Sequence, residues 1–274
     1  MTGFFKAGVN YSMKYLRIKP PPSLSAHVRY FWIGEVGVQF THHAIATSSP
    51  KMVFHYKGSF DEITASGKLQ RSFSSGIQGQ SKKHTQFIAR EPATMFGIEF
   101  FPYVIPSLFS IPATALTDQY IDLTVFLGRK GRELEERIQE AGTTEERIRI
   151  ATRFLESRLH TINHPFIIDA INQINAKNGL VNMAELAKTS PVSQRQFERL
   201  FKELAGFTPK LYARVKRFET ALCQQSGTLT QRALDAGYAD QSHFIRDFRD
   251  FTGLQPRNYF KATANLADVE NVQF

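Results

Sequence analysis

The sequence has one cysteine, Cys223, among 274 residues. A single thiol cannot form an intramolecular disulfide, which fits a reducing compartment. No histidine lies near it in the sequence, so we expect a packing residue and not a nucleophile. No apolar run approaches the length that crosses a bilayer, and the first residues lack a signal-peptide pattern. We therefore expect a cytoplasmic protein without a membrane partner.

Residues arranged for catalysis are also lacking. The stretch G-I-Q-G-Q (76–80) is too short for a glycine-rich phosphate loop. His42 and His43 are adjacent, so on a strand their side chains point to opposite faces, and His55 and His84 are isolated. We expect no enzyme activity, no catalytic residue, no metal and no cofactor.

Basic charge is what the chain does have. It contains 34 Lys and Arg residues against 25 Asp and Glu residues, a formal net charge of +9. Such a surplus favours contact with phosphates and attracts a protein to nucleic acid. The surplus is divided between the two halves of the chain, so charge alone does not locate a binding site. The length is sufficient for two domains with cores of their own.

A motif of twenty residues occurs twice in the second half of the chain. Residues 193–212 read S-Q-R-Q-F-E-R-L-F-K-E-L-A-G-F-T-P-K-L-Y. Residues 240–259, 47 positions later, read D-Q-S-H-F-I-R-D-F-R-D-F-T-G-L-Q-P-R-N-Y. Phe, Arg, Gly, Pro and Tyr recur in one register without a gap. Two copies of one structural unit are therefore expected.

Each copy reads as a capped helix. Ser193 and Asp240 can accept hydrogen bonds from the free amides of a first turn. Apolar residues follow at helical spacing and form one face. Gly206 and Gly253 stand where a left-handed residue ends a helix, and a proline three positions later blocks its continuation.

A shorter helix and a tight turn precede each copy, at residues 183–188 and 230–235, which predicts two helix-turn-helix units. Residues 209–224 read as one amphipathic helix between them, roughly 24 Å long, which could hold two recognition helices about one DNA turn (~34 Å) apart. Arg246 has Asp250 at i+4, so an ion pair is the alternative to base contact there. The expected DNA-contacting residues are Ser193, Arg195, Glu198, Arg199, Lys202, Gln241, Ser242, Arg246 and Arg249.

Residues 165–262 resemble the DNA-binding domain of the AraC/XylS family of bacterial transcription regulators. The strongest part, residues 237–259, has the family's order of Gly-aromatic, Ser, Phe, Arg, Phe-basic, Gly, Pro and Tyr. The resemblance implies an all-α domain with two helix-turn-helix units on adjacent major-groove segments. Pro191 departs from the family in the first turn. Arg195, Glu198 and Ser242 lie at positions that vary among members, so the target sequence does not follow.

The first 120 residues differ from the rest of the chain in residue composition. Residues 28–38, 52–56 and 96–101 are rich in β-branched and aromatic residues, and Gly, Pro and Ser separate them. This pattern predicts short antiparallel strands in a sandwich or small barrel. Two helices should follow, one over residues 123–141 and one, with a capping box at its start, over residues 143–159.

This part resembles, more loosely, the cupin-like sensor domain in one branch of AraC-type regulators. The matching pieces are Y-F-W (30–32), G-I-Q-G-Q, G-I-E-F-F-P (97–102) and the run at 107–118. The resemblance implies a regulatory or dimerising domain, and Trp32 is the candidate ligand contact. The helix at 143–159 has apolar residues on two faces, one to cover the sheet and one to meet a partner in a homodimer.

The sequence thus predicts an α+β protein of two domains. Its parts are a β-rich cupin-like barrel or sandwich (1–121, beginning with a disordered arm before Met13), a helical pair and linker (122–164), an all-α double helix-turn-helix domain (165–262) and a tail (263–274). The predicted function is sequence-specific, effector-responsive regulation of transcription. Expected partners are double-stranded DNA, a small-molecule effector, a second copy of the chain and, for an activator, RNA polymerase. Two alternatives stay open: a metal-dependent cupin enzyme fused to a DNA-binding domain, and a regulator whose N-terminal domain only dimerises.

Overall fold

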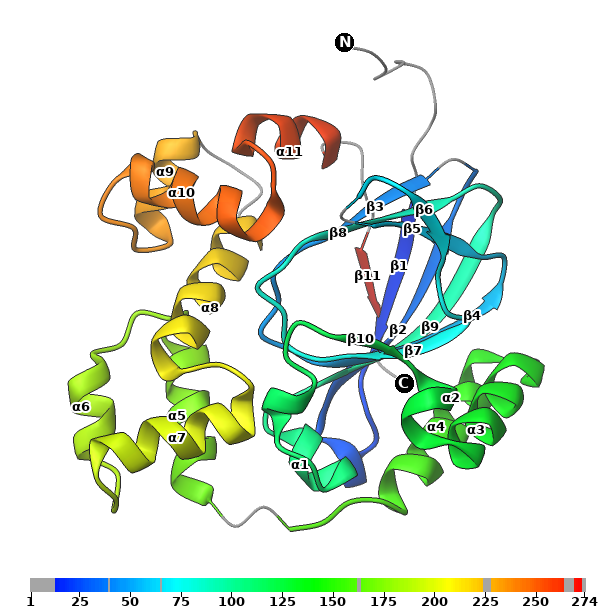
Figure 1. Ribbon diagram of the computed structural model, residues 1–274, viewed down its shortest axis with the longest axis horizontal. Coiled ribbons are helices and arrows are strands. Elements are labelled where there is room, and N and C mark those ends of the chain that lie inside the picture. The colour runs from blue at the N-terminus through cyan, green and yellow to red at the C-terminus, as the bar shows by residue number, and fades with distance from the viewer. Residues whose placement is uncertain are drawn as a thin grey trace.

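The computed structural model describes residues 13–38, 40–64, 66–161, 164–223, 228–263 and 269–272. Figure 1 shows a β-rich part beside a helical part, so the predicted two-domain α+β fold class is confirmed. The arm predicted before Met13 lies outside the described residues. Within those residues, no helix is both long and apolar enough to cross a membrane.

Two sheets make up the β-rich part. The larger has the strand order β10-β7-β4-β9-β2-β1-β11 and the smaller β3-β8-β5-β6. The predicted strands at 28–38, 52–56 and 96–101 correspond to β2, β4 and β9 in the larger sheet. The strands of this part are β1 (Met13–Ile18), β2 (Val28–Val36), β3 (Phe40–Ala44), β4 (Lys51–Lys57), β5 (Phe60–Ile63), β6 (Leu69–Arg71), β7 (Ser75–Gln78), β8 (Thr85–Ala89), β9 (Ala93–Phe100) and β10 (Tyr120–Asp122).

An apolar cluster joins the two sheets. Trp32 and Met95 of the larger sheet pack in one cluster with Phe40 and Phe60 of the smaller. Trp32, only 6 % exposed, lies opposite Gly97 on the neighbouring strand. A Cβ atom at position 97 would lie 1.9 Å from Cε2 of the indole, so the packing of Trp32 requires glycine there.

Four α-helices accompany the sheets: α1 (Val104–Phe109), α2 (Leu123–Leu127), α3 (Arg129–Glu140) and α4 (Thr144–Glu156). The single helix predicted over 123–141 is two helices. Gly128, with φ +60° and ψ −135°, interrupts it between α2 and α3. The predicted cap of α4 is present, because the Thr143 hydroxyl accepts from the amide of Glu146 at 3.2 Å. The Glu146 carboxylate accepts from the amide of Gly142, one residue before the expected donor.

Both apolar faces of α4 pack within the chain. Ile150, Ala151 and Leu155 are buried, and Ile148 and Phe154 are half-buried against the same core. No large apolar side chain of α4 is among the exposed ones in the described residues. The helix therefore offers no spare apolar stripe of the kind predicted to meet a partner.

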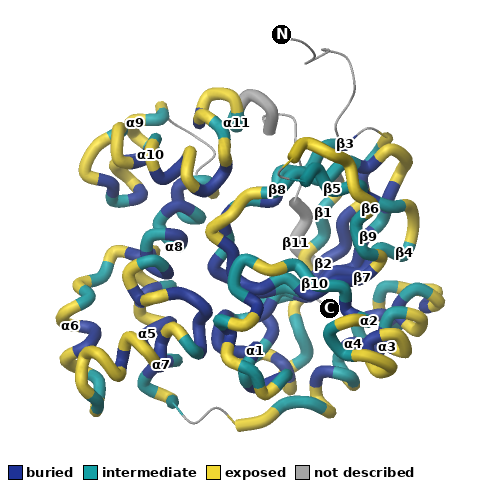
Figure 2. Tube along the Cα trace, in the orientation of Figure 1, coloured by how far each residue is buried: buried dark blue, intermediate teal, exposed yellow. Residues whose placement is uncertain are grey.

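The helical part begins with α5 (Pro165–Ala176) and contains the two predicted helix-turn-helix units. The first is α6 (Met183–Lys188) and α7 (Gln194–Ala205), and the second is α9 (Leu229–Asp235) and α10 (Gln241–Thr252). The linker helix α8 (Pro209–Cys223) joins them, and α11 (Pro256–Thr263) follows. Figure 2 shows that α6 and α9, on the outer side of this part, both carry exposed positions.

The two parts share one apolar cluster and several hydrogen bonds. The Ser48 amide and hydroxyl donate to the carboxylate of Glu219 on α8 at 2.7 and 3.0 Å. The Thr117 hydroxyl donates to the carbonyl of Gly206 at 2.9 Å. These contacts attach the helical part to the β-rich part at α8 and at the end of α7.

The tail predicted at 263–274 contains a strand. Val269–Val272 form β11, which pairs in parallel with β1 so that Tyr15 lies opposite Val269 and Ile18 opposite Val272. The partner strand lies at the other end of the chain, so no local pattern could have shown this pairing.

Two histidines lie on strands that face the cluster between the sheets. The ring of His55 lies 5.1 Å from that of Phe60, and His42 lies 6.5 Å from Phe87. Burial lowers the pKa of His55 to about 4. Burial, reinforced by the charge of Lys51, lowers the pKa of His42 to about 3. Both rings are therefore neutral in the folded protein at neutral pH.

These pKa shifts predict loss of stability in acid. Between about pH 6.5 and pH 4, His55 is protonated in the unfolded chain but stays neutral in the folded chain. The melting temperature should therefore fall as the pH decreases from 6.5 towards 4, and it should fall less in His55→Gln. His160→Gln, at an exposed position, serves as the control. Equal slopes in H55Q and the wild type would show that His55 does not carry the effect.

Candidate nucleic-acid interface

Helices α7 and α10 begin and end as the repeated motif predicts. The Ser193 hydroxyl accepts from the amide of Gln196 at 3.4 Å, and the Asp240 carboxylate accepts from the amide of His243 at 2.7 Å. Gly206 and Gly253 end the helices in the left-handed conformation, with φ of +74° and +69°. The two helices are therefore equivalent elements of the repeat.

The outer face of α7 is polar and open. Arg195, Glu198 and Lys202 are exposed on the side opposite the buried Phe197 and Phe201. At the start of the helix, an open groove of about 430 Å³ is lined by Ser193, Arg195, Gln196 and Arg199. The predicted residues of the first unit therefore lie on one accessible surface.

The outer face of α10 is similar. Ser242, Arg246 and Arg249 are exposed, and Gln241 is half-buried at the first position of the helix. The Gln241 side-chain oxygen accepts from the hydroxyl of Thr230 on α9 at 3.2 Å. This bond orients the amide at the start of the helix.

The ion pair expected for Arg246 occurs instead at the equivalent position in the first unit. Arg199 lies 2.9 Å from the carboxylate of Glu203, at i+4, with both side chains well exposed. Asp250 is engaged by Arg214 of α8 at 2.6 Å, and no ion pair of Arg246 is found in the described residues. An exposed pair is weak, so Arg199 can still turn to a ligand.

Arg214 positions the second unit, a role that was not predicted from the sequence. Its guanidinium donates to Asp247 at 2.8 Å and to Asp250 at 2.6 Å, and it lies 4.8 Å from the ring of Phe251. Asp247 is only 1 % exposed. The sequence signal for this role was the spacing of Asp247 and Asp250, three residues apart on α10, together with a cation, Arg214, on the linker helix.

Trp32, the predicted ligand contact, lies in the β-rich part and not at these helices. Its indole Nε1 is buried and has no hydrogen-bond partner in the described residues. Such a donor is costly to leave unsatisfied. His42, His43, His55 and His84 do not combine into a metal site: the described residues hold no group of three or more His, Cys, Asp or Glu side chains that could bind a metal ion.

Comparison with protein families accounts for two segments. Residues 186–262 match a family described as a helix-turn-helix domain. The chain carries a helix-turn-helix domain of the AraC type. The resemblance inferred from the repeated motif is thus confirmed. Residues 16–122 match a family described as a domain of unknown function (DUF6597).

Two related proteins are named as transcriptional regulators. The chain is 32 % identical over 109 residues to the probable transcriptional regulator LumQ of Photobacterium leiognathi, covering 39 % of this chain and 43 % of LumQ. It is 32 % identical over 126 residues to the HTH-type transcriptional regulator ArgR of Pseudomonas aeruginosa, covering 44 % of this chain and 36 % of ArgR. The matches span less than half of either relative. Among solved structures, ToxT of Vibrio cholerae covers 84 % of this chain and 97 % of its own at 12 % identity and a TM-score of 0.47.

The buried carboxylate of Asp247 should matter more to stability than its exposed neighbour. Asp247→Ala removes a charged hydrogen bond from a buried site and should lower the free energy of unfolding by about 1.5–3 kcal/mol. Asp250→Ala removes a pair that is half exposed and should cost under about 1 kcal/mol. Urea denaturation measures both. Equal losses in the two variants would contradict the assignment of Asp247 as the main anchor of α10.

Proposed function

We propose that this chain is a sequence-specific DNA-binding regulator of transcription. The observation that carries the proposal is the pair of repeated helix-turn-helix units whose capped second helices present exposed basic faces. In such units the second helix enters the major groove and its first turns contact base edges. The relatives named as transcriptional regulators support it.

The residues at the start of each recognition helix would read bases. Arginine pairs with guanine through two hydrogen bonds, which suits Arg195 and Arg199 on α7 and Arg246 on α10. Gln241 can pair with adenine, and the hydroxyls of Ser193 and Ser242 can contact either bases or phosphates. Glu198 can accept from a cytosine amino group, while Lys202 and Arg249, nearer the helix ends, would bind phosphates.

Loss of base contact should appear as loss of discrimination. Arg246→Ala should weaken binding to a duplex selected by the wild-type chain by about 1–3 kcal/mol, and much less to a scrambled duplex. Arg199→Ala should have a similar effect, because Arg199 can exchange its ion pair with Glu203 for a contact with DNA. Fluorescence anisotropy at fixed salt measures both. An equal loss on the two duplexes would show that these arginines bind only phosphate.

We infer in addition that the β-rich part holds a small polar effector between its sheets. The buried indole Nε1 of Trp32, which has no hydrogen-bond partner in the part of the chain that the structure describes, is a donor that a ligand could satisfy. Polar groups lie nearby on the same strand and on the next two strands of the sheet: Tyr30 of β2 donates to Glu99 of β9 at 2.6 Å, and Lys51 of β4 stands opposite Glu99. Burial lowers the pKa of Lys51, which Glu99 partly offsets. An acceptor group on a ligand would take the hydrogen bond that Nε1 of Trp32 can donate, and an anionic group would stabilise the charged form of Lys51.

Trp32 is the only tryptophan, so its emission reports on that site. A compound that changes the DNA affinity of the chain should also change the emission of Trp32, and Trp32→Phe should weaken its effect. Sugars, amino acids and short organic acids form a suitable panel. A compound that alters DNA affinity equally in wild type and W32F, with no change in emission, would place the effector elsewhere.

We expect the chain to act as a homodimer. One pair of helix-turn-helix units reads a short site, so discrimination across a genome favours two chains. Because α4 keeps both its apolar faces within the chain, a homodimer would use another surface of the β-rich part. A cytoplasmic location, the domain limits at 121, 164 and 262, the absence of enzyme activity and, for an activator, contact with RNA polymerase all stay predictions.

A further inference from the structure

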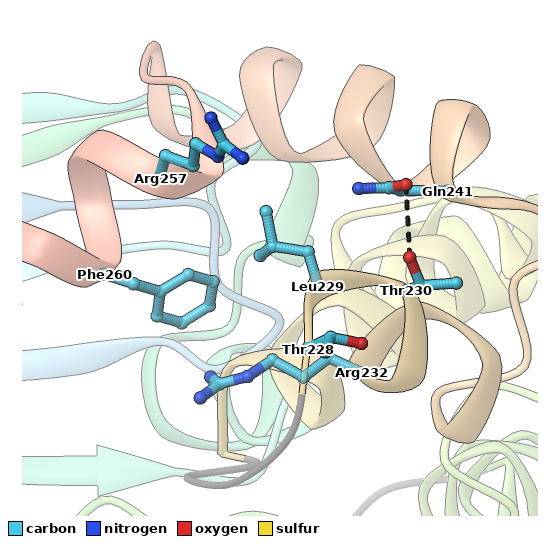
Figure 3. A pocket seen from close by; sticks show the side chains of 7 residues that line it. All are labelled: Thr228, Leu229, Thr230, Arg232, Gln241, Arg257 and Phe260. Atoms are coloured by element: carbon cyan, nitrogen blue, oxygen red, sulfur yellow. Dashed lines mark hydrogen bonds between the residues drawn. The ribbon is translucent and has the colours of Figure 1, made fainter.

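An open groove of about 490 Å³ lies between α9, the start of α10 and α11 (Figure 3). Arg232 of α9 and Arg257 of α11 bring two positive charges to its walls. The guanidinium of Arg232 lies 4.3 Å from the ring centre of Phe260, which limits the positions open to the side chain. Arg257 is exposed near the start of α11. We call this surface the α9–α11 groove.

The remaining lining of the α9–α11 groove combines hydroxyl and apolar groups. Thr228 and Thr230 contribute hydroxyls, and Leu229 and Phe260 contribute apolar surface between the polar side chains. A sugar–phosphate chain has the matching chemistry, because its phosphates are anionic acceptors and the carbon face of its deoxyribose is apolar. Neither a purely apolar ligand nor a free metal cation suits two arginines.

The α9–α11 groove adjoins the surface proposed to read bases. Gln241 lines the groove and is also the first residue of α10, where its side chain bonds to Thr230 across to α9. A strand whose bases meet the first turn of α10 must pass its backbone beside that turn. The groove lies where such a backbone would run.

The equivalent place in the first unit carries less positive charge. Forty-seven positions earlier, Glu185 stands for Arg232, Lys210 for Arg257 and Ala213 for Phe260. An acidic side chain there repels phosphate, and alanine provides no ring to hold a guanidinium. The two units therefore differ in how strongly they can hold a DNA backbone.

We propose that the α9–α11 groove binds the sugar–phosphate backbone of one DNA strand, with Arg257 as its main phosphate contact. This inference rests on the proposed DNA-binding function and adds a division of work to it. The groove anchors the second unit to DNA independently of sequence, while discrimination comes from the recognition helices α7 and α10. Phosphate contacts fix position and carry no sequence information themselves.

The test is the salt dependence of binding by the full chain, measured on a duplex that the wild type selects from a random pool and on a scrambled duplex. Arg257→Ala should weaken binding to both duplexes by the same factor and should reduce the slope of log K against log salt by about 1. Arg257→Lys, which keeps a point charge, should restore the slope. Arg129→Ala removes one exposed arginine from α3, far from the groove in Figure 1, and should leave the slope unchanged.

Two results would overturn the inference. One is that R257A binds DNA with normal affinity and keeps the wild-type slope of log K against log salt. The other is a loss in R257A confined to the selected duplex, which would make Arg257 a base-reading residue. If the wild-type chain bound neither duplex, the proposed function would fail and this inference with it. The far-ultraviolet circular dichroism of each variant checks that the helices are intact.

Discussion

The recognition helices take their positions from close contact between their carboxyl-terminal ends and the β-rich part. Gly206 and Gly253 are equivalent in the two repeats, and both have a positive φ that L side chains rarely adopt. A Cβ atom added at position 206 would lie 2.7 Å from the side-chain oxygen of Gln80. A Cβ atom added at position 253 would lie 2.2 Å from Nε2 of His84. One glycine therefore both ends a helix and lets another domain approach its backbone.

Hydrogen bonds complete the same junction. The Ala46 amide donates to the carbonyl of Phe251 at 3.0 Å near the end of α10, and Thr117 does the equivalent for α7. Ser48 holds Glu219 on α8 between them. The spacing of the two units thus depends on the β-rich part as well as on the linker helix. Such a contiguous junction is a physical route by which a ligand between the sheets could shift DNA affinity.

Local chemistry made much of the helical part predictable. Helix caps, terminating glycines and the spacing of apolar residues each depend on only a few neighbouring residues. Helices α7 and α10 therefore begin and end where the motif predicts. Long-range choices were not predictable. The pairing of β11 with β1 and the docking of Gly253 against His84 depend on residues far apart in the chain. Arg214 and Arg257 were missed because each looks locally like one more exposed cation on an amphipathic helix.

We propose that both helix-turn-helix units, held at one spacing, contact DNA together. Hydroxyl-radical footprinting of the full chain on a selected duplex tests it most directly. We expect protected backbone segments that come in pairs about one helical turn, or roughly 10 base pairs, apart on one face of the duplex. A footprint with a single short segment for each chain would contradict it, since only one unit would then engage the DNA.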